Sequence, residues 1–355
     1  MFLGQGVVKR SDREDNHNVL GEDLSKYQVV RPGDLVFNRL RTWQGGFGAS
    51  AHAGIVSPAY IVARPIGSDA RYLSFVLQSR AYLAELTRLS KWMPPSQFDI
   101  LWGDLRLIEV PWRSLAEQSR IADFLDDRVA RIDQIIAARR RQRDLLESQL
   151  LAQIRLGVAG VWDERRDAVS SPIPWLEKVS REARVAKLSR VLTMQRGVDL
   201  TADEQRPGDV PVITTAGVTG WHDVAIAAGP GVVIGRYGSV GSVHWVEEDY
   251  WPHNTTLYLR DAHGNSLRWA YYLLRSFPYA ALQARAAVPG VNRNDMAAED
   301  VPIIPRRLQA QAADVLDGHA MDASRAKATI AGSIELLTEY KQSLITAAVT
   351  GQLDV

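Results

Sequence analysis

Hydrogen-bond donors and flat aromatic side chains gather in a few glycine-containing loops of this chain. Arginine and lysine can bind phosphates or the O6/N7 edge of guanine, and glutamine can pair with adenine. A neighbouring glycine lets the backbone come close to such a ligand. The sequence therefore predicts loops that could bind nucleic acid. In the first half of the chain the candidates are Arg39, Arg41, Trp43, Gln44, Lys91, Trp92 and Gln97.

Similar residues recur in the second half, in loops that correspond to the first set through an internal repeat. Any one of them could instead be an ordinary surface residue or a half-buried part of the core. As a set that recurs through the repeat, they favour a binding face. The candidates here are Thr214, Thr215, Trp221, His222, Arg236, Tyr237, Ser239, His253, Asn254, Arg285, Asn292 and Arg293.

The sequence lacks the motifs of the common catalytic sites. No Gly-Lys dipeptide occurs, which excludes a phosphate-binding P-loop. The run Gly235–Gly241 has a glycine at every third position and no evident acidic partner, a pattern that argues against a dinucleotide site. The seven histidines are scattered, and no cysteine is present to help form a metal site. We expect no catalytic residue, no metal and no bound cofactor in this chain.

The composition is that of an ordinary globular protein. Of 355 residues, 42 are Lys or Arg and 41 are Asp or Glu, so the net charge is +1 and any basic patch must be local. The absence of cysteine suits a reducing compartment. No segment approaches the roughly 20 apolar residues of a membrane span. We expect a cytoplasmic protein with room for two or more domains.

Part of the sequence occurs twice. Pro111 returns as Pro302 and Gly160 as Gly351, in both cases 191 positions later, with similar residues between. A constant offset over this length indicates a rigid element, because loops tolerate insertions and packed helices do not. Two copies of one unit suggest a pseudo-symmetric molecule that reads a two-part target.

The remaining segments, about 1–110 and 181–303, form a looser repeat. Short apolar runs broken by Gly and Pro predict mixed α/β domains, each with a helix, at Ala70–Leu89 and Ser266–Leu282. A strand is expected at Val185–Leu192, and its counterpart would lie before Met1. The first domain therefore looks short at its N-terminal end.

The repeated segments, about 114–158 and 306–350, are predicted to be long helices of some 40 residues, roughly 60 Å each. Their apolar residues alternate at spacings of three and four, which is typical of a heptad seam. We expect an antiparallel pair; the alternative is two separate helices, each packed on its own domain. The basic run Arg139–Arg143 could touch DNA, but a solvated face or a face for an acidic partner is the better interpretation. The predicted seam consists of Leu125, Val129, Ile132, Ile136, Leu146, Leu150, Leu316, Ala323, Ile330, Ile334, Leu337 and Leu344.

Several motifs resemble those of the specificity (S) subunit of type I restriction–modification systems. They are Pro32–Gly45, Gly54–Tyr60, Gln118–Asp126, Trp251–Thr256 and the C-terminal Glu339–Val355. The resemblance covers nearly the whole chain. It implies an α+β fold with two pseudo-repeated target-recognition domains separated by two long helices in an antiparallel coiled coil. Each domain would read one half of a bipartite DNA sequence.

The resemblance also implies a domain order and a set of partners. The expected segments are a first recognition domain at 1–110, a first helix at 111–160, a linker at 161–180, a second recognition domain at 181–303 and a second helix at 304–355. Double-stranded DNA and methyltransferase (M) subunits would bind directly, and the restriction/translocase (R) subunit through the M subunits. Adenine-N6 methylation with S-adenosylmethionine, and the use of ATP and Mg, would belong to those partners. The alternative is a non-catalytic helical scaffold that binds protein.

Overall fold

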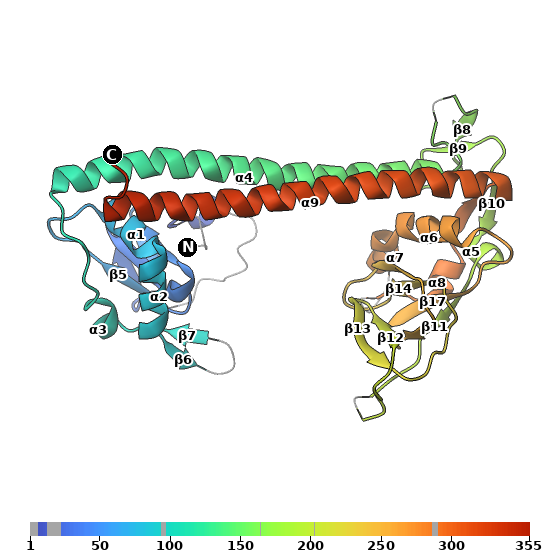
Figure 1. The fold of residues 1–355 in the computed structure, drawn as a ribbon, viewed down its shortest axis with the longest axis horizontal. Helices are drawn as coiled ribbons and strands as arrows, with labels where there is room; N and C mark the ends of the chain where they lie inside the picture. Colours follow the sequence, from blue (N-terminus) through green and yellow to red (C-terminus); the bar gives the residue numbers. More distant parts are fainter. Residues whose placement is uncertain (1–5, 13–22, 94–96, 164, 202, 286–289) are drawn as a thin grey trace. The chain divides into compact units, whose positions relative to one another are not determined.

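The computed structural model describes residues 6–12, 23–93, 97–163, 165–201, 203–285 and 290–355. The fold is α+β, with small sheets and two long helices, α4 (Leu115–Val158) and α9 (Arg306–Thr350), as Figure 1 shows. The two predicted long helices are therefore confirmed. The chain divides into two compact units, unit 1 (Met1–Arg141 with Ile330–Val355) and unit 2 (Gln142–Thr329). Each long helix contributes a part to each unit.

Unit 1 is built on a three-stranded antiparallel sheet in the order β3–β2–β5. Its central strand is apolar and buried, and helices α1 and α2 supply Leu77 and Leu86 to the same core. Two further strand pairs, β1–β4 and β6–β7, complete the unit. The elements are η1 (Arg10–Asp12), β1 (Gln28–Val30), β2 (Leu35–Asn38), η2 (Thr42–Gln44), β3 (Phe47–Ala49), β4 (Gly54–Val56), β5 (Tyr60–Ala63), α1 (Ala70–Gln78), α2 (Arg80–Leu89), β6 (Lys91–Met93), β7 (Gln97–Asp99) and α3 (Trp102–Leu105).

Unit 2 has a four-stranded antiparallel sheet in the order β11–β17–β14–β15 and a three-stranded sheet in the order β13–β12–β16. In the second sheet β12 and β16 are parallel. The elements are β8 (Ala168–Ser170), β9 (Lys178–Ser180), β10 (Arg184–Lys187), α5 (Leu188–Val191), β11 (Thr193–Arg196), β12 (Val210–Thr214), β13 (Gly217–His222), β14 (Gly231–Gly235), β15 (Val243–Val246), β16 (Trp251–Pro252), β17 (Thr256–Asp261), α6 (Leu267–Ser276), α7 (Tyr279–Arg285), α8 (Arg293–Ala297) and β18 (Asp300–Ile303).

Each domain helix predicted as one element is two helices. In unit 2 the chain leaves the helical conformation at Phe277, because Pro278 disfavours helical backbone at the residue before it. In unit 1 the break falls at Ser79, which is extended (φ −65°, ψ 153°) and buried. No proline marks this second break, so the sequence pattern could not reveal it.

Two other expectations about unit 2 are wrong. The strand predicted at Val185–Leu192 ends at Lys187, and a single helical turn follows that buries Leu188 and Val191. The segment 161–180, expected to be a linker, holds the antiparallel β8–β9 hairpin, which packs Ile173 and Val179 into a small core with Ala159.

Strand β10 pairs with β18, which leads directly into α9. The segment of unit 1 that corresponds to β18 through the repeat, 109–112, is assigned to no strand, and its Trp112 is 76% exposed. The start of α4 is instead stabilised by a capping box. Ser114 N donates to Glu117 Oε2 (3.0 Å) and Glu117 N donates to Ser114 Oγ (3.3 Å).

The long helices run antiparallel within each unit. In unit 1, Lys341 donates to Asp133 (2.6 Å), and Arg120 near the start of α4 donates to the carbonyl of Val355 (2.5 Å). In unit 2, Lys327 donates to Glu147 (2.6 Å). The alternative of two separate helices is therefore wrong.

All residues of the predicted seam are buried or half-buried. Within unit 1, those in one core cluster are Leu125, Ile132, Ile136 and Leu344, with Val129, Ile334 and Leu337 packed against them. Within unit 2, Leu150 and Leu316 are in the largest core cluster and Ala323 packs against it. Leu146 is half-buried and Ile330 is buried, although neither belongs to a cluster of the described residues.

The same glutamine fixes a domain helix to a long helix in both units. In unit 1, Gln118 of α4 accepts a hydrogen bond from the backbone N–H of Asp69 (2.9 Å), the residue that caps α1. In unit 2, Gln309 of α9 accepts from the N–H of Ser266 (2.8 Å), which caps α6. Both glutamines are 1% exposed.

Each glutamine also binds the backbone just before its own helix. Gln118 Nε2 donates to the carbonyl of Arg113, and Gln309 Nε2 to that of Ile304, both at 2.9 Å. We call each set of contacts a glutamine clamp. The two clamps are the same contact repeated, so the internal repeat extends from the sequence to the packing.

An ion pair supports each glutamine clamp. Arg71 of α1 contacts Asp126 of α4 (3.0 Å), and Arg268 of α6 contacts Asp317 of α9 (2.6 Å). In unit 2, Tyr272 also donates to Asp317 (2.5 Å). Burial and this hydrogen bond raise the pKa of Tyr272 above its usual value, so the phenol remains a hydrogen-bond donor to Asp317 at alkaline pH as well.

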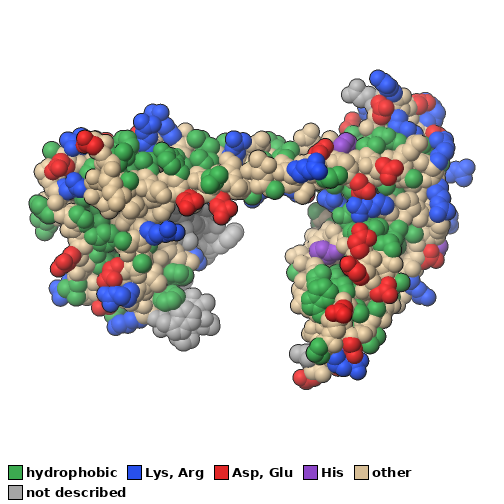
Figure 2. Space-filling model, in the orientation of Figure 1, with side chains coloured by type: hydrophobic (Ala, Val, Ile, Leu, Met, Phe, Trp, Pro, Cys, Tyr) green, Lys and Arg blue, Asp and Glu red, His purple; other side chains and the backbone are tan. Residues whose placement is uncertain are grey.

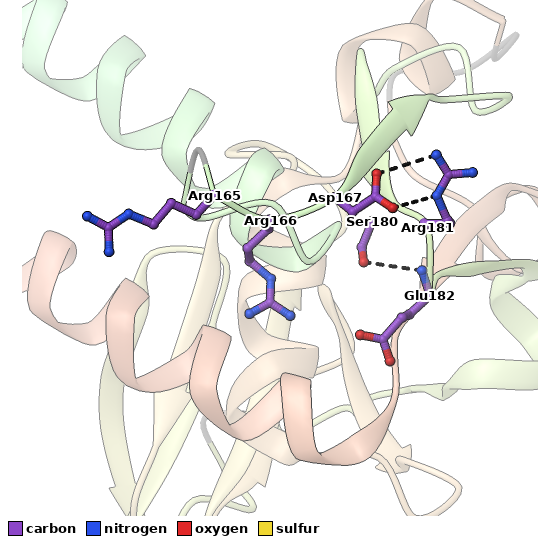
Figure 3. A pocket seen from close by; sticks show the side chains of 6 residues that line it. All are labelled: Arg165, Arg166, Asp167, Ser180, Arg181 and Glu182. Atoms are coloured by element: carbon purple, nitrogen blue, oxygen red, sulfur yellow. Dashed lines mark hydrogen bonds and ion pairs between the residues drawn. The ribbon is translucent and has the colours of Figure 1, made fainter.

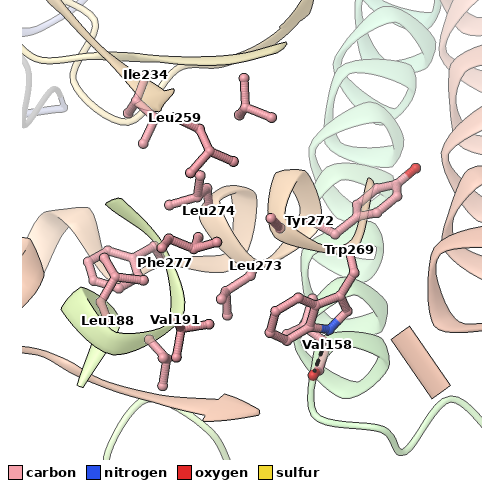
Figure 4. Packing of buried hydrophobic residues seen from close by; sticks show 14 of the residues in the cluster. Val158, Leu188, Val191, Ile234, Leu259, Trp269, Tyr272, Leu273, Leu274 and Phe277 are labelled. Carbon is pink, nitrogen blue, oxygen red and sulfur yellow. Dashed lines mark hydrogen bonds between the residues drawn. The ribbon is translucent and has the colours of Figure 1, made fainter. Parts of the chain in front are cut away.

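Aromatic packing fills the space between α6 and α4 in unit 2. Trp269 and Tyr272 are fully buried, and Trp269 Nε1 donates to the carbonyl of Val158 (3.2 Å), as Figure 4 shows. Gly157 lets α4 and α9 pack closely in the same unit, since a Cβ there would lie 2.8 Å from the side chain of Leu316 in α9. No helix of the described ranges is long and apolar enough to cross a membrane.

We expect the substitution Gln309→Leu to destabilise unit 2. It keeps the volume but leaves the Ser266 N–H and the Ile304 carbonyl buried without partners, at a cost of about 2–4 kcal/mol. Urea unfolding of the full chain measures the loss. Gln311→Ala, at an exposed position of the same helix, is the control and should change the free energy of unfolding little. Equal effects of the two variants would contradict the role of the clamp.

Candidate nucleic-acid interface

Four loops of unit 2 meet in one place. The loop after β14 is joined to the β12–β13 turn by a hydrogen bond from Ser242 Oγ to the carbonyl of Thr215 (2.8 Å). Arg236 N donates to the carbonyl of Thr255, in the β16–β17 connection, and Val291 N donates to the carbonyl of Arg236, both at 3.0 Å. We call this group, residues 214–217, 235–242, 253–255 and 290–292, the loop cluster.

Two glycines allow the loops to come this close. A Cβ on Gly235 would lie 2.4 Å from the carbonyl oxygen of Ser239, which belongs to the backbone and cannot rotate away. A Cβ on Gly290 would lie 2.6 Å from the ring of Tyr237. Glycine is therefore required at positions 235 and 290 for these loops to pack against one another.

Arg236 is the most distinctive residue of the loop cluster. Its guanidinium stacks on the ring of Tyr237, with its central carbon 4.5 Å from the ring centre. Its Nη1 atom is buried and has no hydrogen-bond partner among the described residues. Tyr237 is 40% exposed, so the pair lies at the surface of the cluster.

Other predicted residues of the loop cluster are used mainly for internal structure. Thr214 Oγ1 donates to the carbonyl of Gly217 (3.3 Å), and Asn292 caps α8 by accepting from the N–H of Asn294 (2.9 Å). His253 Nδ1 contacts Thr255 Oγ1 (3.1 Å), and the carbonyl of Asn254 accepts from Arg196 (3.4 Å).

Ser239 and Arg293 are exposed and lie in or next to the cluster. They are therefore accessible to a ligand.

Trp221 and His222 lie at the other end of the β12–β13 hairpin. His222 is opposite Val210, whereas Thr214 is opposite Gly217 at the turn. His222 is 3% exposed, accepts from the backbone N–H of Arg206 (3.1 Å) and packs edge-on against Trp251. Trp221 is 54% exposed but far along the strand from the turn. The structure does not bring these two residues into the loop cluster.

Unit 1 carries an equivalent backbone arrangement around Arg39. Its N–H donates to the carbonyl of Ala59 (3.0 Å), and its carbonyl accepts from Ile100 (3.3 Å), as Arg236 does with Thr255 and Val291. The side chain differs, since Arg39 is paired with Asp99 through Nε (2.9 Å) and Nη2 (2.5 Å).

The remaining candidates of unit 1 surround this arginine. Trp43 packs against Phe98 with ring centres 4.8 Å apart, and its Nε1 donates to the carbonyl of Leu40 (3.2 Å). Arg41, Gln44 and Lys91 are exposed. The side chains of Trp92, Gln97 and Arg285 lie outside the described part of the structure.

Sequence reasoning missed Asp99, which neutralises Arg39, and Ser242, which joins two loops. Asp99 lies 60 positions from Arg39 and carries no local signal. Ser242 closes the glycine-containing stretch, and its place at the end of that loop could have indicated it.

A separate hollow of unit 2 is lined by charged residues of the β8–β9 hairpin region: Arg165, Arg166, Asp167, Ser180, Arg181 and Glu182 (Figure 3). Arg181 is paired with Asp167 (2.6 Å), Glu182 with Arg307, and Arg166 with the carbonyl of Gly160 (2.9 Å). Arg165 points away from this group. These internal pairings make the hollow a salt-bridged surface and not a ligand site.

Charge of both signs is mixed on the visible face of each unit in Figure 2. Within the described ranges no group of three or more His, Asp or Glu side chains could hold a metal ion. The arrangement offers hydrogen-bond donors and aromatic faces to a ligand and brings together no acid–base or metal constellation in those ranges.

Comparison with known proteins finds solved structures of similar fold. No protein-family model and no curated protein sequence matches the chain. Its architecture consists of two mixed α/β units, to each of which both long helices contribute. The chain shares this fold with a solved structure that is described as the structural basis of complex assembly and conformational transition of the type I R-M system. The sequences are 17% identical, the match covers 94% of this chain and 85% of that chain, and the TM-score is 0.70.

Two further solved structures are similar over most of their length. One is the HsdS subunit from Thermoanaerobacter tengcongensis, with 18% identity, coverage of 94% of this chain and 84% of that chain, and a TM-score of 0.47. The other is the S subunit of a type I restriction–modification system from M. genitalium, with 15% identity, coverage of 91% and 84%, and a TM-score of 0.44.

We expect Gly235→Ala to disrupt the loop cluster. The added methyl group meets a backbone oxygen, and overpacking of this kind costs about 1–3 kcal/mol. Thermal unfolding followed by circular dichroism would detect the loss. The matched control is Gly318→Ala in α9, where a Cβ meets nothing within 4 Å; it should stabilise the helix by about 0.5–1 kcal/mol. A Gly235→Ala protein as stable as wild type would contradict the packing argument.

Proposed function

We propose that this chain is the DNA-recognition (specificity) subunit of a type I restriction–modification complex. The observation that carries the proposal is the repeated backbone arrangement around Arg39 and Arg236, one in each unit, beside exposed polar and aromatic loops. A fold shared with a type I R-M system chain supports it. Each unit would read one half of a bipartite target.

The chain contributes binding and no chemistry in this proposal. It belongs to a restriction endonuclease and DNA adenine-N6 methyltransferase complex whose partner subunits use S-adenosylmethionine, ATP and Mg. The net charge of +1 gives little general attraction to DNA. Tight binding therefore depends on the partner subunits as well as on the local donors of the two units.

The experiment that tests the proposal compares DNA methylation in cells with and without this chain, in the presence of its partner subunits. We expect a two-part motif, modified at adenine, that disappears when the chain is deleted. The complex should bind DNA with that motif, and binding should weaken steeply with salt because phosphate contacts release counterions. A methylation pattern that does not depend on the chain would contradict the proposal. Binding to partner proteins alone, indifferent to salt, would favour the scaffold alternative.

The helix pair offers two equivalent docking positions for methyltransferase subunits. Leu145 of α4, in unit 2, is 68% exposed, and Leu336 of α9, in unit 1, is 67% exposed. The two leucines correspond through the 191-residue repeat. Large exposed apolar side chains at matched positions suit two copies of one partner, one on each helix.

We expect Leu336→Glu to weaken association with the methyltransferase subunit by about tenfold or more, since burying a leucine contributes about 1.5–3 kcal/mol. Co-purification and titration calorimetry measure the effect. Ala331→Glu, at an exposed position on another face of α9, is the control and should bind normally. Unchanged affinity in Leu336→Glu together with Leu145→Glu would place the partner elsewhere.

A further inference from the structure

The two units differ in the residue that faces the equivalent arginine. Ile100 and Val291 donate to the carbonyls of Arg39 and Arg236 respectively, so the residues before them occupy matching positions. In unit 1 that residue is Asp99, and in unit 2 it is Gly290.

The difference between Asp99 and Gly290 determines whether the guanidinium of the facing arginine is paired with a carboxylate. Arg39 is held by two hydrogen bonds to the carboxylate of Asp99, and the pair is largely shielded, with side-chain exposures of 34% and 17%. Arg236 has no carboxylate partner among the described residues and rests on Tyr237 instead. The Nη1 group of Arg236 is buried and unpaired, a situation that is unfavourable for a charged donor.

We propose that Arg236 reads a guanine in the half-site of unit 2, and that Arg39 has a structural role and reads no base. This inference rests on the proposed function. Among the described residues Arg236 makes no side-chain hydrogen bond that it would lose by turning outward to a base, and its buried Nη1 would gain a partner, whereas Arg39 would first have to release Asp99.

The chemistry of the stacked arginine favours guanine over other acceptors. The planar fork of a guanidinium matches the two acceptors O6 and N7 of guanine, and in the structure the flat face of this group rests on the ring of Tyr237. A lysine keeps the positive charge but lacks the planar fork, so it can serve a phosphate and cannot read guanine in the same way.

The test is the methylation motif obtained with the substitution Arg236→Lys in the complete complex. In the wild-type motif one guanine should be strongly preferred in one half. In the variant, discrimination against other bases at that position should fall by about tenfold or more, while the other half stays unchanged. Tyr237→Leu, which removes the stacking surface, should weaken the same preference.

Arg39→Lys, at the equivalent position of unit 1, tests the second half of the inference, that Arg39 reads no base. A lysine there can still pair with Asp99, so the base preferences of both halves should remain as in the wild type. Thermal unfolding of each purified variant identifies any that fail to fold. Since Arg236→Lys and Tyr237→Leu test one position by different routes, one folded variant is sufficient to test the role of Arg236.

Three outcomes would overturn the inference. The folded variants could keep the wild-type motif, as expected if Arg236 bound a phosphate that lysine also binds, or lose methylation uniformly at all sites, which would indicate a role in positioning the unit and not in reading a base. The wild-type motif could also lack guanine in both halves. Failure of the proposed function gives a different result, because the methylation pattern would then be the same in cells without the chain.

Discussion

The glutamine clamp is the interaction on which the rest of the structure depends. In each unit one buried amide joins the first turn of a domain helix to the backbone that precedes a long helix. All four bonds are made to backbone atoms, so the clamp sets the position of main-chain segments whatever side chains surround them. The domain loops can then diverge in sequence while the helix that carries them remains fixed to α4 or α9.

Features with a local period or a constant offset could be predicted from the sequence. The long helices followed from spacings of three and four, and the two clamp glutamines, Gln118 and Gln309, are separated by the same 191 positions as the rest of the repeat, although their backbone partners carry no sequence signal. The helix break at Ser79 and the pairing of β10 with β18 depend on tertiary packing. So do the site contacts. Residues of the loop cluster come together through hydrogen bonds between distant segments, and Trp221 and His222 do not join them although they are polar and aromatic too.

The two units use one backbone arrangement for different purposes. Around Arg39 a carboxylate completes the hydrogen bonding and the charge is neutralised within the protein. Around Arg236 a glycine leaves room for Tyr237, and Nη1 has no hydrogen-bond partner in the part of the chain that the structure describes. A repeated scaffold therefore does not imply repeated contacts with a target. The identity of a single facing residue, Asp99 or Gly290, decides whether the arginine is paired with a carboxylate.

Salt weakens the ion pairs beside the glutamine clamps as well as any contact between the chain and DNA. Arg268 and Asp317 are 35% and 37% exposed, and Arg71 and Asp126 are 41% and 48% exposed, so dissolved ions reach both pairs. Raising the salt concentration loosens the attachment of α1 and α6 as well as any contact with an external polyanion. The salt dependence of DNA binding therefore includes the loosening of these ion pairs, and the number of phosphate contacts calculated from it is too high. A chain with uncharged residues at these four positions would show the size of this difference.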